Sequence, residues 1–175
     1  METRADITEG AHLGPGEGRS FWVLGGLVTR KVSSEQNGGA YSLFETVTQP
    51  QEGVPPHLHH REDEFFYVLD GEFEFFENGR TARGGPGDFF YVPKGNLHAY
   101  NNVGEGIGRM LVSQTPGGLH ERFFEEIGEA TTDTSTPPVS EDPPDMESIA
   151  KIAAEYGIEM PSPGRSYNGQ EEITE

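Results

Sequence analysis

The stretch that decides the fold is GVPPHLHHREDEFFYVLDG, residues 53–71, in which a histidine-rich segment leads into an apolar strand. Alternate residues of a β-strand point to one side, so His57 and His59 face one way while His60 faces the other. Two imidazoles at this spacing can chelate a transition metal. Glu64 opens the apolar run, where a buried carboxylate needs a partner because an unpaired one is costly. A polar turn that happens to be rich in histidine is the alternative.

A second stretch, GDFFYVPKGNLHAYNN (residues 87–102), supplies a third histidine. His98 follows a Pro-Gly turn and opens a strand whose inward set is His98, Tyr100 and Asn102. If this strand faces the first across a barrel, three neutral imidazoles and the Glu64 carboxylate meet. Such a set leaves a position for water or substrate, which is typical of catalytic rather than closed structural metal sites.

Alternation also predicts which residues surround this centre. Phe66 and Val68 share a strand face with Glu64, so they are candidates for an apolar pocket wall, and plain core packing is the alternative. The same two readings apply to Tyr100 and Asn102. The remaining polar residues of interest are interpreted as solvent-facing neighbours or bystanders: His60, Glu62, Asp63, His12 and His120.

The region from about residue 20 to 115 consists of short β segments separated by Gly/Pro turns, without a helical period. This pattern favours an all-β antiparallel barrel or sandwich. Asp70-Gly71 and Asn78-Gly79 are two-residue hairpin signals. The expected strands are Phe21–Lys31, Ala40–Thr48, Phe65–Leu69, Glu72–Glu77, Asp88–Val92, Leu97–Asn101 and Gly108–Ser113.

Two amphipathic helices are expected after the strands. The first has Leu119, Phe123 and Ile127 on one face and ends near Gly128, and the second has Asp145 as a cap and Gly157 as a stop. The predicted organisation is a flexible arm (1–19), a barrel with its following helix (20–128), a linker (129–144), a C-terminal helix (145–160) and a disordered tail (161–175).

Composition excludes several classes of function. The chain of 175 residues has 12 basic and 30 acidic residues, a formal charge of −18, which repels nucleic-acid backbones and anionic membrane surfaces. Salt adaptation and an ordinary acidic cytosolic protein both fit this charge. The absence of cysteine excludes disulfides and thiolate metal sites. With no apolar run of the roughly 18 residues that a membrane span needs, a cytoplasmic location is expected.

Two spacings resemble a known family. G-x3-H-x-H-x4-E-x6-G holds at Gly53, His57, His59, Glu64 and Gly71, and G-x5-P-x-G-x2-H-x3-N holds at Gly87, Pro93, Gly95, His98 and Asn102. Together they resemble the two motifs of the cupin superfamily, although Gly53 lies closer to the first histidine than in the usual motif. The resemblance implies a small antiparallel jelly-roll barrel with a metal bound by His57, His59, Glu64 and His98, and it implies a homodimer.

A narrower resemblance concerns GGLHERFFEEIGEA, DEFFYVLDGEFEF and GDFFYVPKGNLHAY, which are similar to segments of single-domain quercetin 2,3-dioxygenase-like cupins. This subgroup implies a metal-dependent dioxygenase that acts with O2 on a flavonol, catechol or enol. Glu64 is the candidate catalytic base, and a role as a metal ligand alone is the alternative. The alternatives are a metal-dependent isomerase or lyase and a non-catalytic small-molecule-binding cupin. The ligand set suits Fe, Mn, Ni, Co, Cu or Zn, so the divalent metal stays open.

Overall fold

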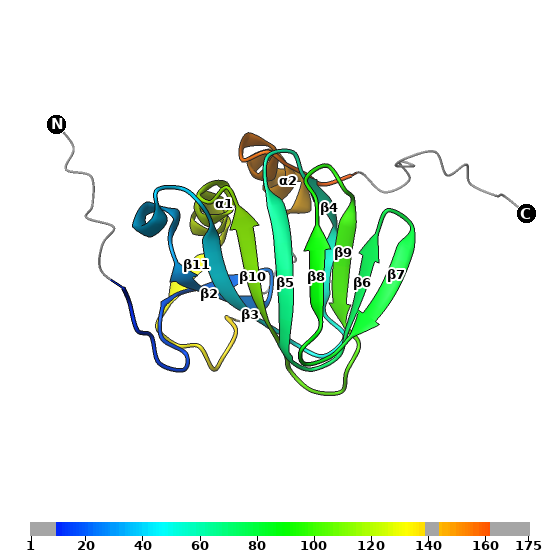
Figure 1. Cartoon of the computed structure of the whole chain (residues 1–175), viewed down its shortest axis with the longest axis horizontal. Helices are drawn as coiled ribbons and strands as arrows, with labels where there is room; N and C mark the ends of the chain where they lie inside the picture. The colour runs from blue at the N-terminus through cyan, green and yellow to red at the C-terminus, as the bar shows by residue number, and fades with distance from the viewer. Residues whose placement is uncertain (1–9, 139–143, 162–175) are drawn as a thin grey trace, which may run out of the picture.

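The computed structural model describes residues 10–138 and 144–161, which form two facing β-sheets with two short α-helices beside them (Figure 1). This arrangement confirms the predicted all-β antiparallel fold. The seven-stranded sheet has the order β11 (Glu129–Thr131), β1 (Arg19–Val23), β2 (Gly26–Val32), β3 (Ser42–Thr48), β10 (Gly108–Thr115), β5 (Asp63–Asp70) and β8 (Phe89–Val92). The five-stranded sheet has the order β12 (Ile158–Glu159), β4 (Gly53–His59), β9 (His98–Asn102), β6 (Phe73–Glu77) and β7 (Arg80–Gly84).

Alternating burial shows how the sequence forms these strands. β3 and β10 alternate strictly between buried and partly exposed residues, so each presents one face to the interior. In β5 the buried residues are Glu64, Phe66 and Val68, which is the face predicted from the sequence. The outward residues Tyr67 and Leu69 of the same strand are also apolar but exposed.

Of the two predicted hairpin turns, one is confirmed and one is wrong. Asn78 and Gly79 have φ values of 46° and 82° and join β6 to β7, which pair directly. Asp70-Gly71 is not a hairpin turn, because β5 pairs with β8 and β10 while β6 belongs to the other sheet. Gly71, with φ of 86°, passes the chain between the sheets, where a Cβ would lie 2.7 Å from Gly108 Cα.

The segment predicted as one strand, Phe21–Lys31, is a hairpin of two strands, β1 and β2, in which Val23 pairs with Gly26. Leu24 and Gly25 form the turn with φ values of 50° and 87°. Leucine rarely adopts this conformation, so the residue types conceal the turn. The strand β7 also escapes prediction, because RTARG shows no apolar alternation.

The inner faces of the two sheets meet in an apolar core. Phe66 packs edge-on against Phe75, and Phe75 stacks on Phe90 with ring centroids 3.8 Å apart. Removal of such side chains from water is the main term that stabilises the fold. The buried members of this core are Phe66, Val68, Phe73, Phe75, Val92, Tyr100, Met110 and Val112.

Two helices lie near each other at one end of the sheets: α1 (Leu119–Ile127) and α2 (Met146–Glu155) (Figure 1). The predicted cap of α2 is present, since the Asp145 carboxylate accepts a hydrogen bond from the Ser148 backbone N–H (3.2 Å). Gly157, with φ of 77°, follows the helix. The chain then adds β12 to the edge of β4, with Ile158 opposite His59.

The predicted boundaries differ in detail from the observed elements. Glu129–Thr131, placed in the linker, form β11 and pair with β1, where the Trp22 indole N–H donates to the Asp133 carbonyl oxygen (3.1 Å). The helix predicted over 145–160 is α2 followed by β12. Of the predicted arm and tail, residues 1–9 and 162–175 lie outside the described residues. No helix among the residues that are described is long and apolar enough to cross a membrane.

Candidate metal centre

The four predicted metal ligands come from both sheets and converge at one end of the barrel interior. His57 and His59 lie on β4, and His98 lies on the adjacent strand β9, directly opposite His57. The three imidazoles are therefore neighbours on one sheet, and the condition considered from the sequence, that the two strands face each other across a barrel, is not needed to bring them together. Glu64 is the residue that reaches the group from the facing sheet, on β5.

The side chains of this group are close and buried. One ligand atom from each of the four residues lies within 4.8 Å of the others. The Glu64 Oε2 atom is 2.9 Å from His98 Nε2 and 3.4 Å from His59 Nε2. Gln114 holds the other oxygen, because its Nε2–H donates to Glu64 Oε1 (2.7 Å). The carboxylate is thus oriented before any ligand binds.

Hydrogen bonds behind the rings decide which histidine nitrogen faces the centre. His57 Nδ1 lies 3.0 Å from the Pro55 carbonyl oxygen, and His98 Nδ1 lies 3.0 Å from the Asn96 carbonyl oxygen. A carbonyl oxygen only accepts, so both Nδ1 atoms carry a proton and Nε2 is left for the centre. This is the arrangement in which outer partners orient metal-ligating histidines.

The donor set fits a transition metal. His59 Nε2 is a buried polar atom without a hydrogen-bond partner, and it lies beside Glu64. Leaving such an atom unsatisfied costs free energy, and a cation at the point where the ligand atoms meet would remove that cost. Imidazole and carboxylate ligands suit Fe, Mn, Ni, Co, Cu and Zn, and the set does not choose among them.

The electrostatics of the group favour an ionised carboxylate at Glu64 and a neutral ring at His57. Burial raises the pKa of Glu64, but the neighbouring His59 and His98 outweigh burial and hold this pKa well below its ordinary value. Burial, together with the charges of His98 and His59, keeps the pKa of His57 well below its ordinary value. Burial also lowers the pKa of His59, but Glu64 and Glu62 more than offset it and the pKa is raised.

Two residues interpreted from the sequence as peripheral belong to this region. The sequence predicts Glu62 on the solvated surface, but this residue is only 1% exposed and its Oε2 lies 3.4 Å from His59 Nδ1. His120, read as a bystander, is buried and its ring stacks on His59 with centroids 4.9 Å apart and planes at 6°. Glu62 looks exposed in the sequence because residues that enclose it, among them His120 at the start of α1, lie far from it along the chain.

The cluster of His59, Glu62 and His120 also has ligand atoms within 4.8 Å of one another. An imidazole binds metal through a lone pair in its ring plane. Two rings stacked at 6° have parallel planes, so their lone pairs do not converge on one point. The stacked geometry therefore favours a supporting role for Glu62 and His120 rather than a second metal site.

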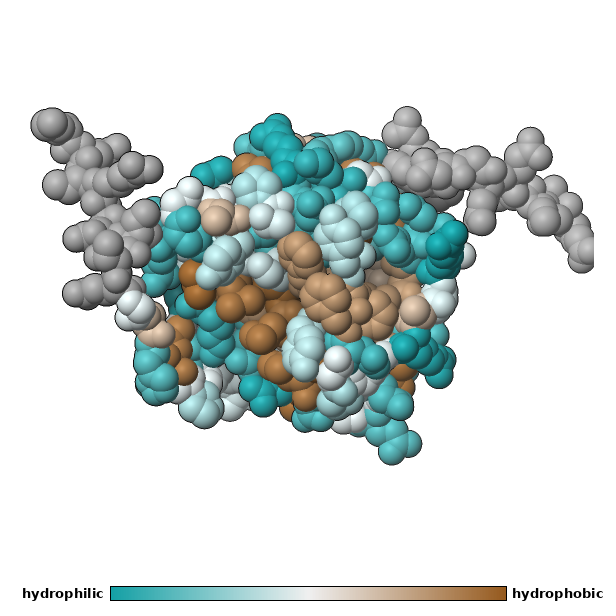
Figure 2. All heavy atoms as spheres, in the orientation of Figure 1, coloured by the Kyte–Doolittle hydropathy of each residue, from teal (hydrophilic) through white to brown (hydrophobic). Residues whose placement is uncertain are grey.

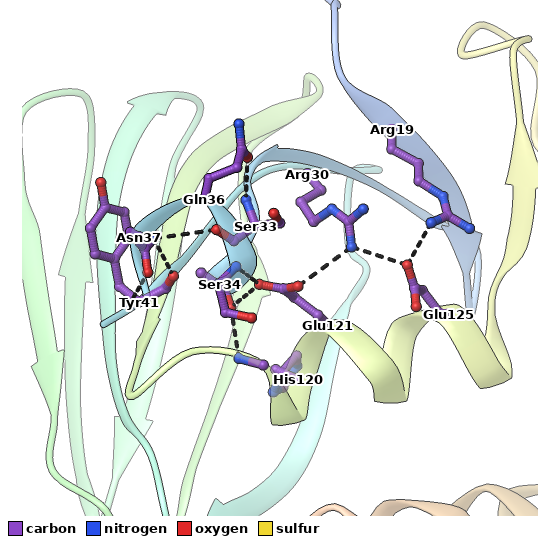
Figure 3. A network of polar contacts seen from close by, with 12 residues as sticks. Arg19, Arg30, Ser33, Ser34, Gln36, Asn37, Tyr41, His120, Glu121 and Glu125 are labelled. Carbon is purple, nitrogen blue, oxygen red and sulfur yellow. Dashed lines mark hydrogen bonds and ion pairs between the residues drawn. The ribbon is translucent and has the colours of Figure 1, made fainter. Parts of the chain in front are cut away.

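The first turn of α1 is fixed by a polar network (Figure 3). The buried carboxylate of Glu121 accepts hydrogen bonds from the Ser34 backbone N–H (2.5 Å) and the Ser42 hydroxyl (2.5 Å). Arg30 adds a contact to the same carboxylate at 3.5 Å and one to Glu125 at 3.0 Å. These bonds tie the start of the helix to the seven-stranded sheet and so set the position of His120.

An apolar cavity of about 110 Å³ adjoins the predicted ligands His57 and Glu64. Of the pocket candidates, Phe66 and Tyr100 line it. Val68 instead packs in the core, and Asn102 is buried and holds a loop by donating to the Thr48 (3.1 Å) and Gly106 (2.8 Å) carbonyl oxygens. The cavity is further lined by side chains from β1–β3, β10, α1 and the C-terminal segment, among them Leu24, Thr46, Gln114, His120, Phe123 and Met160.

Gln114 is a further residue that the sequence reading missed. It lies on β10 in the inward series Met110, Val112, Gln114, so a polar residue among buried positions was the available signal. His60, in contrast, faces outward as predicted and contacts Glu159 on β12 (2.8 Å). Asp63 accepts a hydrogen bond from the Lys94 backbone N–H (2.9 Å) at the surface.

Comparison with known proteins shows which families this chain is similar to. The family model described as "Cupin domain" matches residues 44–113, from β3 to β10. Quercetin 2,3-dioxygenase of Bacillus subtilis (strain 168) is 28% identical over 118 residues, covering 67% of this chain and 34% of that protein. An uncharacterized protein of Aquifex aeolicus (strain VF5) is 38% identical over 50 residues, 29% of this chain and 41% of that protein. The chain thus spans 34–41% of the length of these curated relatives.

Solved structures show the same architecture. KdgF from Halomonas sp. has a TM-score of 0.56 at 20% identity, covering 63% of this chain and 96% of that chain. A predicted oxalate decarboxylase from Thermotoga maritima has a TM-score of 0.51 at 25% identity, covering 56% and 90%. The similarity to KdgF, at 20% identity, shows a shared fold only.

Proposed function

We propose that this chain, which matches the cupin domain over residues 44–113, binds one divalent transition metal ion through His57, His59, His98 and Glu64. The observation that carries the proposal is the buried, unpartnered Nε2 of His59 beside the Glu64 carboxylate. Fe, Mn, Ni, Co, Cu and Zn all suit these ligands.

The reaction we propose is dioxygenation of a small flavonol, catechol or enol with O2. Support comes from the similarity to quercetin 2,3-dioxygenase, which extends over 67% of the chain. A bound metal would supply Lewis acidity and a template for the substrate. The chain's own part is to place a base beside the substrate, to exclude water and to shape the cavity.

In this proposal Glu64 takes the proton of the substrate hydroxyl. Its lowered pKa keeps it ionised before substrate arrives, and Gln114 fixes one of its oxygens. Phe66 and Tyr100 form apolar walls of the adjoining cavity. Burial, followed by the charge of Glu64, raises the pKa of Tyr100, so its hydroxyl stays protonated and serves as a hydrogen-bonding group rather than a base.

The cavity favours the smaller, uncharged members of these substrate classes. Its volume of about 110 Å³ lies below the ~300–1,000 Å³ of pockets for drug-sized ligands. None of the described residues that line it is a lysine or arginine. Gln114, which lines the cavity, has a buried side-chain oxygen without a hydrogen-bond partner, which would accept a hydrogen bond from a hydroxylated ligand. A catechol or small enol fits these features better than a flavonol.

A metal-dependent lyase is the second candidate, favoured by the likeness to a predicted oxalate decarboxylase. A dicarboxylate would enter a cavity whose described lining has no lysine or arginine to neutralise it, which argues against that substrate. An oxygen electrode separates the two reactions. Substrate consumption coupled to O2 uptake supports the dioxygenase, and consumption without uptake removes it in favour of the lyase.

Elemental analysis tests the metal itself. Protein purified without chelator or metal-affinity resin is expected to contain close to one transition metal ion per chain. Metal-free protein that also fails to bind added Fe, Mn, Ni, Co, Cu or Zn would contradict both enzyme candidates.

Glu64→Gln tests the role of the carboxylate, because it keeps the shape of the side chain and removes its basicity. We expect turnover to fall by about 10²–10⁴-fold, the usual contribution of a general base, with a smaller loss of bound metal. Glu105→Gln, at an exposed acid, is the matched control. If metal content and turnover disappear together in Glu64→Gln, the residue acts only as a ligand.

We also propose that the chain forms a homodimer through the outer face of the seven-stranded sheet. Figure 2 shows apolar side chains gathered on this face, and the exposed ones on β5 and β8 include Tyr67, Phe89 and Tyr91 (44%, 58% and 46% exposed). Contiguous apolar surface of this kind marks association sites. Sedimentation velocity is expected to give a dimer for the wild type and a monomer for Phe89→Lys. A monomeric wild type would contradict the proposal.

A further inference from the structure

We propose that Glu62 and His120 position His59 for metal binding, so that helix α1 is part of the metal centre. The inference rests on the metal site proposed above. It concerns two buried side chains that have no place in the chemistry described so far. Three features of the molecule support this role: the contacts of Glu62, the stacked ring of His120 and the anchoring of α1.

Glu62 is enclosed and faces histidines. Its side chain is 1% exposed, and its ion-pair partners within the described residues are His59 (3.4 Å) and His120 (3.9 Å), each through Nδ1. Its other oxygen accepts a hydrogen bond from the backbone N–H of His120 (3.3 Å). A buried carboxylate without a basic partner is costly, so its place behind His59 calls for a function.

The contact between Glu62 and His59 determines which nitrogen of His59 faces the centre. When the Nδ1–H of His59 donates to the carboxylate, the lone pair of Nε2 is left pointing toward Glu64. His57 and His98 achieve the same orientation with backbone carbonyl oxygens. Among the three, His59 alone is oriented by a charged side chain, which also makes its Nε2 a stronger donor to a metal.

His120 fixes the plane of the same ring. It stacks on His59 at 4.9 Å and 6°, and it packs edge-on against Phe124 at 4.4 Å and 76°. Rotation of the His59 ring about its Cβ–Cγ bond would collide with this stack. Glu62 therefore sets the direction of the lone pair, and His120 keeps the ring in that orientation.

The position of His120 is in turn set by the opposite sheet. Its neighbour Glu121 accepts hydrogen bonds from Ser34, which precedes β3 (Figure 3), and from Ser42, which is the first residue of β3 in the seven-stranded sheet. A ligand on the five-stranded sheet is thus held by a helix anchored to the seven-stranded one. A substitution that weakens the anchoring of α1 should therefore change the metal affinity of the site, although every metal ligand is still present.

The test measures Co²⁺ affinity by chelator competition, together with the visible absorption of the bound Co²⁺, for wild type, Glu62→Gln, His120→Phe and His120→Ala. Glu62→Gln is expected to bind Co²⁺ about 10–100-fold more weakly and to change the spectrum. His120→Phe keeps a stacked ring and should stay close to wild type, whereas His120→Ala should bind more weakly. Glu105→Gln is the control for loss of an exposed acid.

A double-mutant cycle separates positioning from a general structural effect. If Glu62 acts through His59, then Glu62→Gln should cause no further loss of Co²⁺ affinity in a His59→Ala background. An equal loss in both backgrounds, or unchanged affinity and spectrum in Glu62→Gln, overturns the inference. Should Glu62→Gln fail to fold, the comparison of His120→Ala with His120→Phe decides, and equal affinity in those two overturns the role of the stack. Wild type that binds no Co²⁺ overturns the proposed metal site and the inference with it.

Discussion

The two ends of the barrel interior are built by the same strands but from opposite kinds of side chain. At one end, Glu64 on β5 stands opposite Gln114 on β10, and at the other, Val68 stands opposite Met110. Both ends are buried. The apolar end gains free energy from burial, whereas the polar end costs free energy unless every group finds a partner. We therefore assign the apolar end to stability of the fold, and the polar end is the one at which we propose metal binding.

The largest effect should come from truncation at the apolar end. Phe73 is fully buried and contacts Phe75 and Tyr100, so Phe73→Ala leaves a cavity. The free energy of unfolding is expected to fall by about 3–5 kcal/mol, measured by denaturant titration of the metal-free protein. Metal affinity of the fraction that remains folded should change little. A selective loss of metal binding would show that the two ends are not separable.

The opposite pattern is expected for His98→Ala at the polar end. Loss of a ligand should weaken metal binding by more than the ~10–100-fold typical of a supporting residue. The metal-free protein should keep its far-ultraviolet circular dichroism spectrum, because His98 is a predicted metal ligand and is not a member of the apolar core. Isothermal titration calorimetry measures the affinity. Wild-type affinity in this variant would contradict the predicted ligand set.

A smaller effect concerns pH. Burial lowers the pKa of His120 to about 3, whereas an unfolded histidine titrates near 6.5. Below that value the unfolded chain binds a proton that the folded chain does not, so stability falls as pH decreases from about 6.5 toward 3. For one such proton the slope is about 1.4 kcal/mol per pH unit. His120→Phe should reduce the slope of the unfolding free energy against pH by this amount in metal-free protein, and an unchanged slope would contradict neutral burial of His120.

The strand alternation in the sequence was sufficient to predict the inward set of β5 and of β9. It could not predict that β4 and β9 are neighbours, because the pairing of strands depends on long-range contacts. For the same reason Asp70-Gly71 looked like a hairpin turn although the chain changes sheets there. Local residue types specify a turn, but they do not specify which strands it joins.

Glu62 and His120 show that burial can also be difficult to predict from the sequence. Glu62 stands in the polar run REDE, and nothing adjacent in sequence marks it as buried. Its environment is created by α1, which begins more than fifty residues later, and the hydrogen bond between them spans 58 positions. His120 stands at the start of a predicted helix, and the sequence around it favours interpretation as a bystander. Tertiary packing overrides that expectation here.

The edges of the five-stranded sheet bear on how the protein behaves at high concentration. One edge is β7, whose sequence RTARG places two arginines on a short exposed strand. At the other edge, the two-residue strand β12 occupies the backbone groups of β4 next to His59. Charge at one border and a short covering strand at the other discourage a second molecule from extending the sheet by β-pairing. The strand that carries two of the predicted ligands is thereby kept out of amyloid-like contacts.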